Sequence, residues 1–322
     1  MSTNTANTSA RVAVVGAGAV GSYFGGMLAR AGVPVTLIAR PAHVEAIRRG
    51  GLFMDSIHFQ ERIAIGASAE VSAARDAEFV LFCVKTLDTE EAARLLAPNL
   101  APGATVVSLQ NGVDNVPRIR AASGIDAAPS VVYVAAAMPA PGRVKHSGRG
   151  DLIIGEFEQR SGPARTERVA SLFTGAGVPC RISANIEADL WTKLIMNCAG
   201  NAVTALAHAS YGRAARDPGT REVMRKVIEE TVAVARAAGV RLPDVDLVET
   251  GLKLAETLGE ATSSTAQDIA RGKPTEIGSL NGYVVRRGAE LGIATPVNAT
   301  LQALVGLLEQ TAAKQTHSTT AS

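Results

Sequence analysis

The sequence predicts an α/β fold in which an N-terminal parallel-sheet domain precedes a C-terminal all-α domain. In the first half, short apolar runs alternate with segments of helical length, which is typical of βαβ units. A glycine-rich turn follows the first apolar run. From about Ile186 the apolar residues recur with helical period. The predicted ranges are 11–184 and 185–312, with flexible tails at 1–10 and 313–322.

Length and composition fit two globular domains. The chain has 322 residues, of which 47% are hydrophobic and 19% charged. The 32 basic and 30 acidic residues are dispersed, and only 4% are aromatic. We therefore expect neither nucleic-acid nor membrane binding. The N-terminus lacks a signal-peptide pattern, and the cysteines Cys83, Cys180 and Cys198 show no metal-ligand spacing, so a cytoplasmic protein with free thiols is expected.

The strands predicted for the first domain are short apolar runs bounded by turn residues. Their ranges are Val12–Val15, Val35–Ala39, Phe79–Val84, Val106–Leu109, Val131–Ala137 and Leu152–Ile154. A helix is expected from the glycine turn to about Ala31. Val12–Ala29 carries no charge, but its glycines and β-branched start favour a buried strand and helix over a membrane span.

Four helices are predicted in the second domain. Their ranges are Asp189–Ala207, Arg221–Ala238, Leu247–Leu258 and Glu276–Leu291. Gly239 is expected to end the second, and Gly292 follows the fourth. Pro274 and Thr275 are typical of a helix start.

The first motif that carries chemistry is the loop after the first strand, which predicts a dinucleotide-binding Rossmann-type domain. A tight turn, a close backbone approach to a pyrophosphate and close helix–strand packing each require a glycine. The following helix N-terminus offers free N–H groups to phosphate oxygens. The alternative is a glycine-rich packing turn with no ligand. The loop residues are Gly16, Ala17, Gly18, Ala19, Val20 and Gly21.

Two basic residues follow predicted strands at the edge of the sheet where ligands bind. Arg40 stands where an NAD enzyme usually has an acidic residue for the ribose hydroxyl. A guanidinium there can pair with a 2′-phosphate, which favours NADP over NAD. The alternative is a solvated charge at a strand end. Lys85 either contacts the cofactor or is a surface lysine.

The predicted helix Asp189–Ala207 is apolar except for one polar stripe. Lys193, Asn197, Asn201 and Thr204 share one face of it. Either a cleft with a polar ligand or solvent along one edge would satisfy these groups. Lys193 is a candidate general acid, because a ketone that takes up hydride becomes an alkoxide and needs a proton.

Two further segments have ordinary explanations when read locally. Glu276 in a helix first turn is typical of a charge that interacts with the helix end. Asn111-Gly112 after a strand is typical of a turn.

Taken together, these residues resemble the ketopantoate reductase (2-dehydropantoate 2-reductase) family over roughly residues 11–310. The resemblance depends on motifs in a fixed order along the chain. They are the loop Gly16–Gly21, Leu109-Gln110-Asn111-Gly112, Leu190-Trp191-Thr192-Lys193-Leu194 with Asn197-Cys198 and Asn201, Ser264 with Gln267-Asp268, Pro274-Thr275-Glu276-Ile277, and Asn281-Gly282.

The resemblance implies NADPH-dependent reduction of a small 2-keto acid at a site between a Rossmann domain and a helical domain. Lys193 matches the catalytic lysine that donates the proton, and Glu276 matches the glutamate that contacts the substrate hydroxyl. Asn111 matches an asparagine near both nicotinamide and substrate. The other substrate-binding positions are Asn197, Asn201 and Ser264. The basic residues around the NADPH phosphate are Arg40 and Lys85.

The chain departs from the family pattern at two places near the predicted pocket. Asp114 stands where many relatives have glycine, and Gly278 and Ser279 stand where relatives often have Asp and an aromatic residue. The leading hypothesis is reduction of ketopantoate to pantoate for pantothenate and coenzyme A synthesis. The alternatives are a paralogue acting on another keto acid and a non-catalytic NADPH sensor. A homodimer is possible, and the five histidines show no metal-ligand spacing.

Overall fold

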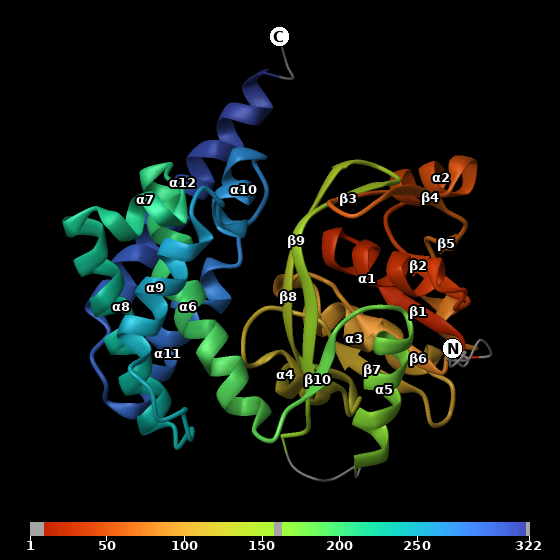
Figure 1. The fold of residues 1–322 in the computed structure, drawn as a ribbon, viewed down its shortest axis with the longest axis horizontal. Coiled ribbons are helices and arrows are strands. Elements are labelled where there is room, and N and C mark those ends of the chain that lie inside the picture. Colours follow the sequence, from red (N-terminus) through yellow and green to blue (C-terminus); the bar gives the residue numbers. More distant parts are fainter. Residues whose placement is uncertain (1–9, 158–162, 320–322) are drawn as a thin grey trace. The chain divides into compact units, whose positions relative to one another are not determined.

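A ten-stranded sheet forms most of the N-terminal part of the computed structural model, which describes residues 10–157 and 163–319. The chain divides after Ile186 into two compact units (Figure 1). The first unit contains the sheet with helices on its faces, and the second is built from helices. The predicted fold class, a Rossmann-type parallel-sheet unit followed by an all-α unit, is confirmed.

Six neighbouring strands form a continuous parallel region of the sheet, in the order β5-β2-β1-β6-β7-β8. The chain starts in the middle, runs to one edge and then returns to fill the other side. The order therefore reverses between β1 and β6, where open α/β sheets bind ligands. These strands are β1 (Val12–Val15), β2 (Val35–Ile38), β5 (Gly66–Ser68), β6 (Phe79–Phe82), β7 (Thr105–Ser108) and the start of β8 (Ala128–Ala140).

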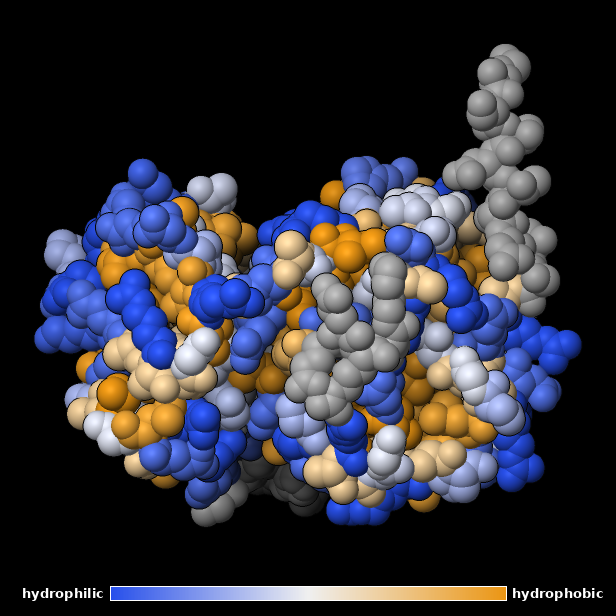
Figure 2. Space-filling view, turned by 90° about the horizontal axis from the view of Figure 1, so that it is seen from below, coloured by the Kyte–Doolittle hydropathy of each residue, from blue (hydrophilic) through white to orange (hydrophobic). Residues whose placement is uncertain are grey.

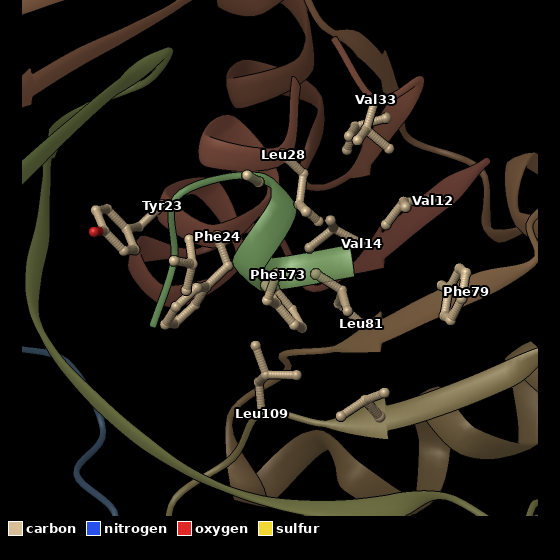
Figure 3. Packing of buried hydrophobic residues seen from close by; sticks show 14 of the residues in the cluster. Val12, Val14, Tyr23, Phe24, Leu28, Val33, Phe79, Leu81, Leu109 and Phe173 are labelled. Atoms are coloured by element: carbon tan, nitrogen blue, oxygen red, sulfur yellow. The ribbon is translucent and has the colours of Figure 1, made fainter. Parts of the chain in front are cut away.

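Both faces of this parallel sheet are buried, as expected for apolar runs without alternation. Val12 and Val14 of β1 belong to one core cluster, whereas Ala13 and Val15 belong to the other. Figure 3 shows the first cluster, in which Phe24 packs edge-on against Phe173 with ring centroids 5.9 Å apart. The helices of this unit are α1 (Ala19–Arg30), α2 (Pro41–Gly50), α3 (Thr89–Leu96), α4 (Asn115–Ser123) and α5 (Pro163–Gly175).

The later strands differ from the predicted βαβ pattern. β8 continues into a long antiparallel hairpin with β9 (Arg143–Ile154), so the expected parallel arrangement of residues 131–137 and 152–154 is wrong. The reason is the connection: only Pro141 and Gly142 join the two strands, too few for a crossover helix. Strands with alternating burial or of very short length were not predicted from the sequence. These are β3 (Leu52–Ser56), β4 (Gln60–Ile63), β5 and β10 (Cys180–Ile182).

The helical unit contains the predicted helices with small changes at their ends. α6 and α9 agree closely with prediction. The C-cap residue of α8 is Ala238, and the predicted cap Gly239 follows it in the left-handed conformation, with φ of 84°. The predicted helix over 276–291 is instead a short 3₁₀ turn, η4 (Ile277–Ser279), followed by a break at Leu280 and then α11. The helices are α6 (Ile186–Ala207), α7 (Tyr211–Arg216), α8 (Pro218–Ala237), α9 (Leu247–Leu258), α10 (Ser264–Ala270), α11 (Asn281–Leu291) and α12 (Pro296–Thr319).

Residues 1–9 and 320–322, in the expected tails, lie outside the described residues; Ala10 is buried and α12 continues to Thr319. Among the described residues, no helix has the length and apolarity that crossing a membrane requires. On the face shown in Figure 2, hydrophilic residues are dispersed among hydrophobic ones. Cys198 is buried, whereas Cys83 and Cys180 are partly exposed.

Candidate active site

The predicted cofactor residues of the first unit lie at one edge of its sheet. The last residues of four parallel strands are in register: Val15 pairs with Ile38 and with Phe82, and Phe82 pairs with Ser108. The glycine loop, Arg40, Lys85 and Asn111 each follow one of these strand ends within three residues. The fold thus brings together four segments that are far apart in the sequence.

Main-chain hydrogen bonds fix the start of the glycine loop. The N–H groups of Gly16 and Ala17 both donate to the Ile38 carbonyl, at 3.1 and 3.0 Å. Gly16 has a φ of 84°, and a Cβ there would lie 2.6 Å from the Val84 nitrogen. Gly16 therefore has a left-handed backbone conformation and also lies close to the loop after β6. Only glycine allows both without strain.

The other two glycines have different surroundings. A Cβ at Gly21 would lie 2.8 Å from a Val14 methyl group, so this glycine lets α1 pack closely on β1. At Gly18 the nearest heavy atom would be 4.0 Å away, so the backbone borders open space. Gly18 begins α1 without a side-chain cap, which leaves the helix N–H groups available to a phosphate.

The two predicted basic ligands flank this loop at the same sheet edge. Arg40 is exposed and is the N-cap residue of α2, two residues beyond the end of β2. Lys85 is half-buried and precedes the 3₁₀ turn that starts at Thr86. Both positions fit a cation beside a bound nucleotide.

A buried polar network that was not predicted from the sequence holds the loops after β6 and β7 together. The Gln110 amide nitrogen donates to the Val84 carbonyl and to Thr89 Oγ1, at 3.1 and 2.8 Å. The Asn111 carbonyl accepts from Asn115 Nδ2 at 2.6 Å and from Thr86 Oγ1. Polar side chains directly after apolar strands were the only local signal for this network. It fixes the main chain at Asn111.

In the helical unit, the predicted polar stripe of α6 divides into two parts. Lys193 and Asn197 are half-buried, whereas Asn201 and Thr204 are 2% and 0% exposed. Asn201 Oδ1 accepts from the Tyr211 hydroxyl at 2.7 Å, and Thr204 Oγ1 donates to Ser263 Oγ at 2.8 Å. Hydrogen bonds within the protein, and not solvent along the helix, therefore satisfy the polar groups of Asn201 and Thr204.

These contacts place the start of α10 on α6. Ser263 is buried, caps α10 through the Ala266 N–H and donates to the Asn201 carbonyl at 3.2 Å. The next residue, Ser264, is exposed. The predicted substrate residues Asn201 and Ser264 thus come from helices joined at this point.

The segment before η4 is held by a residue of α12. Glu309 Oε2 accepts from the Thr275 N–H at 3.0 Å and from Thr275 Oγ1 at 2.6 Å. Thr275 is 3% exposed, and its Oγ1 also accepts from the Ile277 N–H at 3.3 Å. Both neighbours of Glu276 are therefore fixed. Glu276 is the N-cap residue of η4, so the predicted helix-end position holds for a 3₁₀ turn.

The start of α11 is tied to α6 close to the polar stripe. Asn281, fully buried, donates from Nδ2 to the Cys198 carbonyl at 3.2 Å and to Asn298 Oδ1 at 3.0 Å. The rings of Trp191 and Tyr283 lie edge-to-face with centroids 5.8 Å apart. α6 therefore carries Lys193 and Asn197 on a segment to which α11 is attached at both ends. No group of metal-binding side chains occurs among the described residues.

Comparison with known proteins agrees with this two-part arrangement. Residues 12–159 match the sequence model described as ketopantoate reductase PanE/ApbA, and residues 185–309 match its C-terminal counterpart. A 2-dehydropantoate 2-reductase of Halobacterium salinarum is 35% identical over 305 residues, 93% of this chain and 99% of that protein. The chain belongs to the ketopantoate reductase family. The corresponding enzyme of Archaeoglobus fulgidus is 34% identical, over 92% of this chain and 96% of its own.

Solved structures show the same fold. A PanE/ApbA family ketopantoate reductase from Ralstonia eutropha JMP134 is 50% identical with a TM-score of 0.87, covering 94% of this chain and 99% of that one. A D-mandelate dehydrogenase bound to NADH and anilino(oxo)acetate has the same TM-score of 0.87 at 22% identity, with 94% and 99% coverage. Membership in the ketopantoate reductase family makes the chain an oxidoreductase with a dinucleotide-binding fold.

Proposed function

We propose that this protein reduces 2-dehydropantoate to pantoate with NADPH, in the cytoplasm, as a step of pantothenate and coenzyme A synthesis. The observation that carries the proposal is the match to relatives of that name over more than nine-tenths of the chain. The two structural units supply complementary groups. Residues 11–184 are assigned to cofactor binding and residues 185–312 to substrate binding and catalysis.

The residues at the sheet edge fit an NADP molecule. The open surface at Gly18 and the uncapped start of α1 suit a pyrophosphate, which the loop Gly16–Gly21 would hold. Arg40 is assigned to the 2′-phosphate, because it stands where an acidic residue would be needed for NAD. Lys85 and Asn111 are assigned to the same cofactor. When bound, the reduced nicotinamide supplies a hydride to the keto carbon.

The helical unit would supply the proton. As C2 takes up the hydride, negative charge develops on the keto oxygen. We assign Lys193 as the group whose ammonium stabilises that charge and donates the proton. Glu276 is assigned to the hydroxyl side of the substrate, where its carboxylate accepts a hydrogen bond and supports the lysine.

Four amide or hydroxyl side chains are assigned to substrate binding: Asn111, Asn197, Asn201 and Ser264. The geometry at Asn201 limits how it can act. Its Oδ1 already accepts from Tyr211, so Nδ2 is the atom able to donate to a carboxylate or keto oxygen.

Two alternatives follow from specific features. Gly278 and Ser279 lie directly after Glu276-Ile277, where the family pattern has larger residues, so a paralogue with the same chemistry on another 2-keto acid is the second candidate. An NADPH sensor without catalysis is the third. The presence of both Lys193 and Glu276 favours a reductase over a sensor. A homodimer is the assembly we propose to test by light scattering.

The deciding experiment follows the oxidation of NADPH by the purified protein with ketopantoate. Parallel reactions contain NADH in place of NADPH or other 2-keto acids in place of ketopantoate. We expect rapid turnover with NADPH and ketopantoate. Turnover only with another keto acid would retain the mechanism and reject the substrate, whereas NADPH binding without any turnover would favour the sensor.

Arg40 can be tested in the same assay. Arg40→Ala should raise the KM for NADPH roughly tenfold through loss of a charge-assisted bond, and leave the KM for NADH nearly unchanged. Arg49→Ala, an exposed arginine at the other end of α2, is the control. An equal loss with both dinucleotides would reject the 2′-phosphate assignment.

A further inference from the structure

A buried histidine of the first unit has a partner on each ring nitrogen. His43 lies in the first turn of α2 and is 5% exposed. The Gly142 N–H, in the turn between β8 and β9, donates to His43 Nδ1 at 2.8 Å. His43 Nε2 lies 3.2 Å from Ser22 Oγ on α1. One imidazole therefore links three elements that are distant in the sequence.

The direction of these hydrogen bonds follows from their donors. A backbone N–H can only donate, so His43 Nδ1 must be the unprotonated nitrogen of a neutral ring. Nε2 then carries the hydrogen and donates to Ser22 Oγ. The Ser22 hydroxyl in turn donates to the Ala17 carbonyl at 3.1 Å. The chain of donors runs from Gly142 through His43 and Ser22 to the glycine loop.

This relay ends on a peptide group of the loop that we assign to the pyrophosphate. The Ala17 carbonyl and the Gly18 N–H belong to one planar peptide. Ser22 holds the carbonyl end, and the Gly18 N–H donates to the Gly16 carbonyl at 2.7 Å. Fixing both ends sets the orientation of the last peptide before α1 begins, next to the open surface at Gly18.

The far end of the relay is also fixed. Gly142 has a φ of 72°, and a Cβ there would lie 2.9 Å from Ala46 Cβ, so the hairpin turn packs directly on α2. The N-cap residue of α2 is Arg40. His43 is therefore linked through Ser22 to the loop assigned to the pyrophosphate, and lies three residues from the arginine assigned to the 2′-phosphate.

We propose that His43 is a positioning residue for the dinucleotide, acting through Ser22 to hold the Ala17–Gly18 peptide in its binding orientation. The proposal depends on the proposed function only through dinucleotide binding, and not on which keto acid is reduced. It predicts that cutting the relay weakens binding of the reduced dinucleotide, while kcat at saturating cofactor and the KM for the keto acid stay unchanged.

A pair of matched serines allows a direct test. Ser22 and Ser56 are both buried in the first unit, and each contacts a buried histidine: Ser56 Oγ lies 3.0 Å from His146 Nδ1. Ser22→Ala removes the link to the glycine loop. Ser56→Ala removes a comparable contact on β3. Binding of NADPH is measured by its fluorescence on the purified full-length protein, and Tm is measured for each variant.

We expect Ser22→Ala to raise the Kd for NADPH about fivefold to tenfold, the effect of one lost buried hydrogen bond. Ser56→Ala should lower Tm about as much as Ser22→Ala does, because each variant loses one buried hydrogen bond. It should keep the Kd for NADPH within about twofold of the value for the protein without substitutions. His43→Asn keeps an acceptor near Gly142 but is too short to reach Ser22, so it should match Ser22→Ala. The double variant Ser22→Ala/His43→Asn should show no further loss of NADPH affinity, since both substitutions break the same relay.

Equal Kd values for Ser22→Ala and Ser56→Ala would overturn the proposal, as would full additivity in the double variant. If Ser22→Ala does not fold, His43→Asn supports the same comparison with Ser56→Ala. A protein without substitutions that fails to bind NADPH would overturn the proposed function and this proposal together. Binding by that protein, with no difference between the serine variants, would overturn only the relay.

Discussion

The glycine loop of the first unit and the site residues of the helical unit are held in place by different means. In the first unit, glycines and main-chain hydrogen bonds shape the loop, as at Gly16 and its bond to the Ile38 carbonyl. In the helical unit, side chains from distant segments hold the site residues, as Glu309 holds Thr275 beside Glu276. A loop shaped by its own backbone has a sequence motif of a few adjacent residues. A site held by side-chain contacts between distant segments has no such motif, because the contacts exist only in the folded chain.

This difference explains which parts of the site the sequence could predict. The Gly16–Gly21 loop, its flanking strands and Arg40 follow from local spacing and steric rules. Lys193 and Asn197 follow from helical period, but Thr204 on the same stripe turns inward to Ser263, which period alone cannot reveal. Glu276 reads locally as a helix-end charge, because its support comes from α12.

Strand direction was the main failure in the fold. An apolar run predicts a buried strand but not whether its neighbour is parallel, and the two-residue turn at Pro141-Gly142 decides this for β8 and β9. That turn is also the origin of the relay through His43. The relay spans 99 residues from Gly142 to His43, so no local pattern could indicate it.

The largest effect is expected in the helical unit, at Lys193. Lys193→Ala should lower kcat by about 10²-fold or more, because the reduced carbonyl loses its proton donor. The Kd for NADPH should stay unchanged, since the cofactor residues belong to the other unit. Steady-state kinetics and fluorescence titration measure the two quantities.

Lys253→Ala on α9 is the matched control, because that lysine is exposed and forms an ion pair with Glu249 at 3.5 Å. It should leave kcat unchanged. An undiminished kcat in Lys193→Ala would remove Lys193 from the mechanism. A parallel loss of NADPH affinity would show that the two units do not divide their roles as proposed.

The next largest effect is expected in the first unit, at Gly16. Gly16→Ala forces an L-residue to a φ of 84° and places Cβ 2.6 Å from the Val84 nitrogen. Strain of about 1–3 kcal/mol, with a backbone clash added, should raise the Kd for NADPH at least tenfold by a rough conversion. Fluorescence titration of NADPH measures it.

Gly103→Ala separates strain from site geometry. Gly103 also has a positive φ, 78°, but a Cβ there would meet nothing within 4 Å, and it precedes β7 at the opposite edge of the sheet. Gly103→Ala should have a lower Tm and an unchanged Kd for NADPH. Equal affinity losses in both glycine variants would mean that the loop does not act locally.

A smaller effect is expected at Thr275, which tests whether side-chain contacts position Glu276. Thr275→Val removes the hydroxyl that donates to Glu309 at 2.6 Å and nearly keeps the volume. Loss of a buried bond to a charged group costs about 1.5–3 kcal/mol. We expect a lower Tm together with a several-fold lower kcat.

Thr231→Val provides the comparison within the same unit. Thr231 is fully buried, and its hydroxyl donates to the Val227 carbonyl at 2.8 Å within α8. Its loss should reduce Tm without changing kcat. If both threonine variants left kcat unchanged, the link from Glu309 to Glu276 would be structural only.

The smallest effect is expected on the pH dependence of stability, and it arises from the relay in the first unit. Burial lowers the pKa of His43 in the folded protein, whereas the unfolded chain has the ordinary value of about 6.5. As the pH falls below that value, the unfolded chain binds a proton that the folded ring resists, so stability is lost. A protonated Nδ1 would also face the Gly142 N–H, donor against donor.

The variant His43→Asn tests this effect. Its Tm should fall less than that of the protein without substitutions between about pH 7.5 and pH 5. His58→Asn, at an exposed ring, should show the full loss, and an identical loss in all three proteins would mean that His43 does not titrate against folding.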